Sequence, residues 1–309
     1  MAKILYTITE DDGVVRVDKF LAHLHSEYSR AALAKLFTLN LIKLKGEPIQ
    51  PGHKLRPGTT FEYDLGPLQA VPEVIPLPIL YEDDNVIVVN KPAGIISHAR
   101  GKFWQEASVA SFIRDKISQK SKASIGEGKA GVMEGERGGI VHRLDRATSG
   151  VMICAKNEAT LSFLQKQFSA RTVDKKYIAV VSGKLKHKSA VIDAPIARNA
   201  QDPKKFQVAS DGKTAQTQYE VLKSSDDLNL HTLELSPRTG RTHQLRVHLA
   251  YINTPIIGDE LYGILPYSRL LLHAYKLTIT IPDIGIKTFE SPIPDEFNEV
   301  YNDISSKNR

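Results

Sequence analysis

Apolar and polar positions in the first part of the chain predict two helices followed by short strands. The first helix is indicated by apolar residues at helical spacing, namely Val17, Phe20, Leu21 and Leu24. Ser29 is a favoured N-cap residue for a second helix, and Asn40 is suited to end that helix in the left-handed conformation. Strands are predicted at 41–44 and 60–63. Residues 13–65 therefore predict a small α+β domain.

The next segment differs in composition rather than in periodicity. Residues 66–78 contain four prolines in thirteen positions, which predicts a semi-rigid linker between two domains. We therefore expect the second domain to occupy residues 79–309.

Strand patterns dominate this second domain. Strands are predicted at 86–89, 177–181, 228–235 and 270–281. Alternation across 205–221 around the Asp211-Gly212 turn predicts a β-hairpin. Helices are predicted behind an Asn157 cap and across 242–252. Because few strands and helices alternate, we expect an α+β domain with a mixed, largely antiparallel sheet and packed helices.

A segment at 118–139 is rich in Ser, Lys, Gly and Glu, and this composition predicts a mobile loop. Within it, residues 126–131 match the GxGxxG pattern of dinucleotide-binding proteins. That fingerprint requires a preceding strand, and residues 118–122 show no strand pattern. We therefore predict no nucleotide cofactor.

The composition shows an excess of basic over acidic residues. The 309 residues carry a formal net charge of +6, and their 41% hydrophobic content is ordinary for a soluble globular protein. Lysines gather in the N-terminal domain, which favours nucleic acid as the partner. The single cysteine, Cys154, excludes an internal disulfide. The first residues lack a secretory signal and no run approaches the roughly 18 apolar residues of a membrane span, so we expect a cytoplasmic protein.

The candidate chemistry lies in a short polar loop that presents Asp145 between Arg143 and Arg146. A carboxylate in this setting is suited to a site for an anionic ligand, although an ordinary loop aspartate fits the same pattern. A hydrolytic triad of Asp145 with Ser149 and His142 is disfavoured, because all three fall within eight residues and no GxSxG elbow exists.

A second polar segment supplies three arginines and two histidines, namely Arg238, Arg241, Arg246, His243 and His248. The two histidines are five residues apart and lie off one helical face, so we predict no metal site. Thr242, His243 and Gln244 crowd a predicted helix N-terminus, where backbone N–H groups favour anions.

Taken together and in order, these segments resemble the RluA-type family of RNA pseudouridine synthases. The longest matches are His142-Arg143-Leu144-Asp145 with Thr148-Ser149-Gly150, Lys176-Tyr177, and the run Gly-Arg-Thr-His-Gln-Leu-Arg-Val-His at 240–248. Shorter matches lie at 90–94, 212–217, 258–259 and 270–274. They keep the order of the family across roughly residues 79–295.

The resemblance implies an enzyme that isomerises uridine to pseudouridine in RNA without a cofactor or metal. The family's catalytic aspartate, active-site tyrosine and aspartate-pairing basic residue fall at Asp145, Tyr177 and Arg246. Arg143 would hold the place of a base flipped out of the RNA, and a leucine from 270–272 would pack against the uracil. The sequence leaves three roles open for Asp145: attack on ribose C1′, attack on base C6, or proton abstraction. The predicted RNA contacts are Arg143, His142, Arg241, His243, Lys35, Lys43 and Lys45.

The N-terminal domain resembles the small RNA-binding domain named after the fourth protein of the small ribosomal subunit. The matching residues are Arg16-Val17-Asp18, Ser29-Arg30 and Gly46. Asn40 stands at the usual glycine of the helix-to-strand corner, and Lys45 adds charge at the usual asparagine.

Family members with this extra domain mostly modify large-subunit ribosomal RNA, which we therefore expect as the substrate. Transfer RNA is the first alternative, and a non-catalytic RNA-binding or ribosome-assembly protein is the second. The intact set of Asp145, Tyr177 and Arg246 favours the enzyme. We expect a monomer whose partner is structured RNA.

Overall fold

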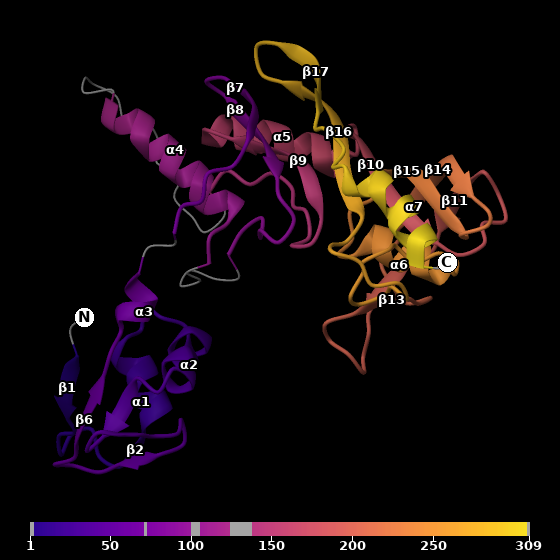
Figure 1. Ribbon diagram of the computed structural model, residues 1–309. Coiled ribbons are helices and arrows are strands. Elements are labelled where there is room, and N and C mark those ends of the chain that lie inside the picture. The colour runs from indigo at the N-terminus through magenta and orange to yellow at the C-terminus, as the bar shows by residue number, and fades with distance from the viewer. Residues whose placement is uncertain (1–2, 71–72, 100–105, 124–137, 308–309) are drawn as a thin grey trace. The chain divides into compact units, whose positions relative to one another are not determined.

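The computed structural model describes residues 3–70, 73–99, 106–123 and 138–307 (Figure 1). The chain divides into two compact units, Met1–Glu73 with Ala99–Glu106 and Val74–His98 with Ala107–Arg309. Each unit buries its own apolar residues, so each has a core that does not depend on the other.

The small unit packs two helices, α1 (Val17–Leu24) and α2 (Arg30–Thr38), against short strands. Four strands form a sheet in the order β1 (Ile4–Thr7), β6 (Thr60–Tyr63), β3 (Ile42–Leu44) and β4 (Glu47–Pro48). A second pairing joins β2 (Val15–Arg16) to β5 (Lys54–Leu55), and α3 (Gly66–Gln69) follows the sheet. Leu21, Leu36 and Phe61 bring the helices and the sheet into one core.

Local sequence signals in the small unit are confirmed. The Ser29 hydroxyl accepts a hydrogen bond from the Ala32 backbone N–H at 3.2 Å and caps α2. Asn40 follows the end of this helix with a φ of 56°, as the left-handed ending requires. Lys45 and Gly46 both have positive φ values, 53° and 88°, which suits a two-residue hairpin turn between β3 and β4.

The ends of the predicted linker at 66–78 are packed rather than extended. Residues 66–69 form α3, and Leu68 is buried in the core of the small unit. At the other end, Leu77 is buried in a core cluster of the large unit. The small unit also begins before residue 13, because β1 pairs with β6.

The large unit is built on a nine-stranded sheet. Its order is β11 (Ser189–Asp193), β14 (Gln216–Ser225), β15 (Leu230–Pro237), β10 (Asp174–Ser182), β16 (Leu272–Ile281), β9 (Ser149–Ala155), β8 (Val86–Lys91) and β7 (Ile79–Glu82), with β17 (Gly285–Glu290) paired to β16. Among the strands that the structure describes, only β16 and β9 run parallel. The prediction of a mixed, largely antiparallel sheet with packed helices is confirmed.

Helices cover both faces of the sheet at β8 and β9 (Figure 1). One face packs Ile87 and Met152 against Ile113 of α4 (Val109–Ala123). The opposite face packs Val88 and Ile153 in one cluster with Leu164 of α5 (Glu158–Ala170). Burial on both sides explains why these strands read as continuous apolar runs. The Asn157 cap of α5 is confirmed, because its side chain accepts from the Thr160 N–H at 2.9 Å.

Two further helices, α6 (Gln244–Tyr251) and α7 (Glu296–Lys307), pack in the largest core cluster with β10 and β15. The short strands β12 (Ile196–Arg198) and β13 (Phe206–Val208) form a separate pair. No helix in the described part of the chain has the length and hydropathy needed to cross a bilayer.

The hairpin predicted across 205–221 is wrong. A turn is present, since the Gly212 N–H donates to the Ala209 carbonyl at 3.0 Å, but β13 pairs with β12 while β14 pairs with β11 and β15. The backbone of Ile196 lies against Gly212, so close that a Cβ on the glycine would come within 2.6 Å of it. The β12 segment therefore occupies the place where the returning arm would have paired.

The predicted loop at 118–139 is wrong in its first part, because α4 continues through Ala123. Residues 124–137 lie outside the described residues, and so does the GxGxxG match at 126–131.

Candidate active site

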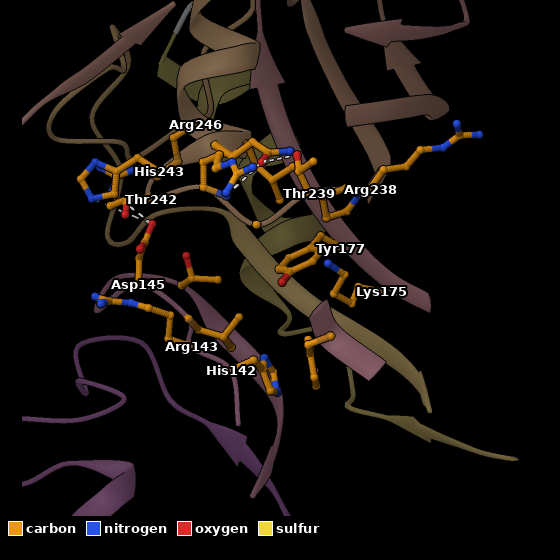
Figure 2. A pocket seen from close by; sticks show the side chains of 18 of the residues that line it. His142, Arg143, Asp145, Lys175, Tyr177, Arg238, Thr239, Thr242, His243 and Arg246 are labelled. Atoms are coloured by element: carbon orange, nitrogen blue, oxygen red, sulfur yellow. Dashed lines mark hydrogen bonds and ion pairs between the residues drawn. The ribbon is translucent and has the colours of Figure 1, made fainter. Parts of the chain in front are cut away.

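A cavity of about 470 Å³ opens in the large unit where three segments meet (Figure 2). Its walls come mainly from the loop before β9, from β10, and from residues 237–246, which run from the end of β15 into α6. Asp145 is the only carboxylate among the described residues that line it. Figure 2 shows this side chain directed from the loop toward His243 and Arg246, with Tyr177 on another wall.

The backbone around Asp145 is fixed by hydrogen bonds from outside the loop. The Ser97 hydroxyl donates to the Leu144 carbonyl at 2.7 Å and accepts from the Leu144 N–H at 3.0 Å. On the other side, the Arg146 carbonyl accepts from the Gly94 N–H at 2.8 Å and from Lys91 Nζ at 3.2 Å. Both neighbours of Asp145 are therefore anchored, which orients its carboxylate without engaging it.

Two nitrogen groups face this carboxylate at longer range. Asp145 Oδ2 lies 3.8 Å from Nη1 of Arg246 and 4.0 Å from Nε2 of His243. Its side chain keeps 19% of its surface exposed. These separations exceed hydrogen-bond length, so the Asp145 oxygens retain capacity to contact a ligand.

Asp259 is the principal partner of Arg246. Nε and Nη2 of Arg246 donate to the two carboxylate oxygens of Asp259 at 2.7 and 2.6 Å. Asp259 also accepts from the backbone N–H groups of Leu261 and Tyr262. Burial alone would raise the pKa of Asp259, but Arg246 and these N–H groups outweigh it and leave the pKa below its ordinary value.

The predicted pairing of Asp145 with Arg246 is therefore a secondary contact at 3.8 Å. Sequence reasoning noted Gly258-Asp259 as a short match but gave Asp259 no part in the site. The available signal was that Asp259 directly follows Gly258, a glycine that takes a positive φ of 73°.

His243 ends the segment that leads into α6. The helix was predicted across 242–252 and runs from Gln244 to Tyr251, with His243 at the N-cap in a left-handed conformation with a φ of 57°. Its Nδ1 lies 2.9 Å from the Tyr262 hydroxyl, which also accepts from the Phe206 N–H at 2.8 Å. Burial lowers the pKa of His243, against the opposing charge of Asp145.

The Gln244 side chain fixes the segment that precedes α6. The Gln244 side-chain oxygen accepts from the Arg241 N–H at 3.0 Å and from the Thr239 hydroxyl at 2.7 Å. Nε of Arg241 donates to the Thr214 carbonyl at 3.0 Å. Arg241 therefore lines the cavity with part of its guanidinium already engaged.

Tyr177 lines the cavity from β10, next to a bulge between Lys176 and Tyr177. Burial, with a smaller contribution from the charge of Asp145, raises the pKa of the Tyr177 hydroxyl well above its usual value. The phenol therefore stays neutral at physiological pH. Of the leucines at 270–272, Leu272 lines the cavity.

His142 lies in the cavity wall and is engaged by the protein itself. Its Nε2 accepts from the Ile153 N–H at 3.2 Å, and its ring stacks on Phe168 with centroids 4.7 Å apart. Burial lowers the pKa of His142 to about 3. By contrast, Arg143 is exposed at the cavity, where its guanidinium can reach a ligand.

The other predicted residues fall outside this cavity. Lys35 and Lys43 are half-buried and Lys45 is exposed, all on the small unit. Ser149 is buried at the start of β9, where its hydroxyl lies 2.7 Å from Nδ1 of His273. The structure therefore assembles no Ser149–His142–Asp145 triad. Within the described residues, no group of three or more His, Cys, Asp or Glu side chains is placed to hold a metal ion.

Solved structures place this fold in the pseudouridine synthase class. Human RNA pseudouridylate synthase domain containing 4 is 26% identical and superposes with a TM-score of 0.57, over 74% of this chain and 93% of that chain. Human RNA pseudouridylate synthase domain containing 1 is also 26% identical, with a TM-score of 0.55, over 74% of this chain and 87% of that one.

Sequence comparison defines the family more narrowly. The family described as RNA pseudouridylate synthase matches residues 85–251. Ribosomal large subunit pseudouridine synthase D of Borreliella burgdorferi is 45% identical over 231 residues, which cover 73% of this chain and 68% of that protein. An uncharacterized RNA pseudouridine synthase of Aquifex aeolicus is 38% identical over 302 residues, covering 93% and 92%. The chain belongs to the RluA-type family of RNA pseudouridine synthases and is an RNA isomerase.

Proposed function

We propose that the protein converts specific uridines of large-subunit ribosomal RNA to pseudouridine, with Asp145 as the essential carboxylate. The observation that carries this proposal is the isolation of Asp145 as the single carboxylate among the described lining residues of the cavity. The cavity volume of about 470 Å³ lies within the range of about 300 to 1,000 Å³ usual for small-molecule sites. The name of the Borreliella burgdorferi relative supports large-subunit ribosomal RNA as the substrate.

The reaction moves one bond without net oxidation. The bond between N1 of uracil and C1′ of ribose breaks, and a bond between C5 and C1′ forms. The hydrogen on C5 leaves as a proton and N1 gains one, so atoms and electrons balance without an added reactant. Asp145 would serve as nucleophile or base, because its oxygens are not occupied by short hydrogen bonds to Arg246 or His243.

Arg246 and Tyr177 would have different roles, because Arg246 would act on Asp145 and Tyr177 on the uracil. Asp259 holds the Arg246 guanidinium rigidly, so its charge stays 3.8 Å from Asp145 and orients that carboxylate. Tyr177 would stack on the uracil as a neutral phenol. Its raised pKa argues against a resting phenolate that removes the C5 proton.

The target base must leave the RNA stack to reach the cavity. Flipping a base out of a paired or stacked position costs on the order of a few kcal/mol. Arg143 is exposed beside Asp145 and would hold the vacated place in the RNA, which offsets part of that cost. The small unit would add phosphate contacts through Lys35, Lys43 and Lys45.

The experiment compares Asp145→Asn with Asp227→Asn, a matched change at an exposed turn. Tritium release is measured from a large-subunit ribosomal RNA transcript labelled with [5-³H]uridine. Asp145→Asn is expected to lower the rate by about 10⁴-fold or more while keeping the fold and RNA affinity, and Asp227→Asn to leave the rate unchanged. Unchanged tritium release in Asp145→Asn would refute the catalytic role.

Substrate identity is tested by mapping pseudouridine in a deletion strain and its parent. Loss of sites in large-subunit ribosomal RNA is expected. Loss confined to transfer RNA would overturn the substrate assignment, and altered ribosome assembly with no lost site would favour the non-catalytic alternative.

A further inference from the structure

A second hollow of about 710 Å³ adjoins the Asp145 cavity in the large unit. It lies at the start of β10 and β14 and the end of β15, and it shares Arg171, Lys175 and Arg238 with the cavity wall. The two spaces are therefore neighbours with a common basic boundary.

Lys175 stands on this boundary. It is half-buried, and within the described residues its Nζ forms no hydrogen bond or ion pair. The next residue provides a contrast, because Lys176 Nζ contacts Glu234 at 2.8 Å. Burial, with a contribution from the charge of Arg171, lowers the pKa of Lys175 despite the opposing charge of Asp174. A partly desolvated cation without a bound anion is unfavourable, and an anionic ligand would remove that penalty.

The charges that line the hollow suit a phosphate only at the boundary shared with the Asp145 cavity. Arg171 and Arg238 are exposed on the shared boundary, and in Figure 2 Arg238 extends away from Asp145 while Lys175 lies beside Tyr177. Two carboxylates, Asp174 and Asp193, line the hollow beyond the boundary, and that of Asp193 accepts from the Gln216 amide at 2.8 Å. A phosphate is therefore favoured at the shared boundary and disfavoured beside Asp193.

We propose that this hollow binds the nucleotide adjacent to the target uridine and that Lys175 binds the phosphate joining the two nucleotides. The inference rests on the proposed function, because it takes the target uridine to occupy the Asp145 cavity. A strand whose uracil enters that cavity passes its backbone over the boundary, where Lys175 is the half-buried cation. Polar groups such as the Gln218 amide would contact the neighbouring base with little sequence preference.

The test uses the full-length protein and a large-subunit ribosomal RNA transcript. Equilibrium binding is measured across a series of KCl concentrations for wild type, Lys175→Ala, Lys175→Arg and Lys184→Ala. Lys184 is exposed just beyond the far end of β10 and serves as the matched control. Tritium release gives kcat and KM for the same four proteins.

Lys175→Ala is expected to weaken binding about tenfold at low salt and to reduce the slope of log affinity against log salt by about 0.7 to 0.9. Lys175→Arg should keep the slope because it keeps the charge, and Lys184→Ala should match wild type. In Lys175→Ala, KM should rise more than kcat falls. A lowered kcat with an unchanged salt slope would show that Lys175 only supports Tyr177, and it would overturn the phosphate assignment.

The binding measurement separates this inference from the proposed function. If wild type makes no pseudouridine in the transcript, the proposed function fails, whereas the slope still reports whether Lys175 meets a phosphate. If wild type is active and Lys175→Ala has the wild-type slope, only the second site fails.

Discussion

Asp145 and Asp259 share the guanidinium of Arg246 but use it differently. Asp259 has a fully buried side chain and receives two short hydrogen bonds from Arg246 and two from backbone N–H groups. Asp145 lies 3.8 Å from the same guanidinium and keeps 19% of its side chain exposed. A carboxylate can accept about four hydrogen bonds, so Asp259 is saturated and Asp145 is not.

The difference separates a carboxylate that is fully engaged by the protein from one that is free to contact a ligand. A buried ion pair with all its hydrogen bonds made holds a cation in one position but cannot exchange partners for a substrate. The Asp145 loop is anchored by hydrogen bonds from the Ser97 and Lys91 side chains to the backbone of Leu144 and Arg146, which leave the Asp145 carboxylate itself available. Asp259 holds Arg246 in place, and in the proposed mechanism the Arg246 charge orients Asp145.

The largest expected effect is on folding stability at Asp259. Asp259→Asn leaves Arg246 buried without its anionic partner, which should lower the free energy of unfolding by about 3 to 5 kcal/mol. Asp145→Asn removes only longer contacts at a partly exposed site and should lower it by less than about 1 kcal/mol. Urea unfolding of both variants measures the difference, and equal losses would contradict the division of roles.

A second prediction concerns how the Asp145 loop is anchored. His142 is held neutral in the folded protein with its pKa lowered to about 3, whereas in the unfolded chain it titrates near 6.5. Below that pH the unfolded chain binds a proton that the folded protein does not, so stability should fall by about 1.4 kcal/mol per pH unit. His142→Gln keeps an acceptor for Ile153 but cannot titrate there.

The measurement is urea unfolding of wild type and His142→Gln at about pH 7 and about pH 5. The wild type should lose about 2 kcal/mol more than the variant over this interval. His273, with its pKa lowered to about 4, is present in both proteins, so its contribution cancels. The same acid sensitivity in both proteins would show that His142 does not anchor the loop through its neutral form.

Features that depend on neighbouring residues could be predicted from the sequence. The Ser29 and Asn157 caps each rest on a hydrogen bond to a residue three positions later, and both are confirmed. The antiparallel sheet follows from strand patterns without alternating helices. The motifs around Asp145 and Tyr177 also indicated two segments that the fold brings to one cavity.

Features set by non-local packing could not be predicted. The contact of Asp259 with Arg246 depends on the turn that begins at Gly258. A Cβ on Gly258 would come within 1.9 Å of the Arg269 carbonyl oxygen, and no local pattern predicts this approach. The turn at Asp211-Gly212 is local and present, but its arms pair with other strands because Ile196 lies against it. A pattern can locate a turn or a strand, whereas the choice of partner belongs to the whole sheet.

The smallest expected effect lies at Tyr262, which contacts both Asp259 and His243. Its backbone N–H donates to Asp259, and its hydroxyl contacts Nδ1 of His243, whose Nε2 faces Asp145. Tyr262→Phe keeps the backbone donor and removes the hydroxyl, so stability should fall by only about 1 kcal/mol. The freed His243 ring should misplace Asp145, and kcat should fall about three- to tenfold with little change in KM.

Urea unfolding and tritium-release kinetics on the same preparation separate an effect on stability from an effect on activity. If the contacts of Asp259 are independent of the Tyr262 hydroxyl, Tyr262→Phe loses only about 1 kcal/mol in unfolding while its kcat is lower. A stability loss as large as that of Asp259→Asn would show that the Tyr262 hydroxyl supports the buried pair. The two aspartates would then form one cooperative network, and the proposed catalytic carboxylate of Asp145 could not be altered independently of Asp259.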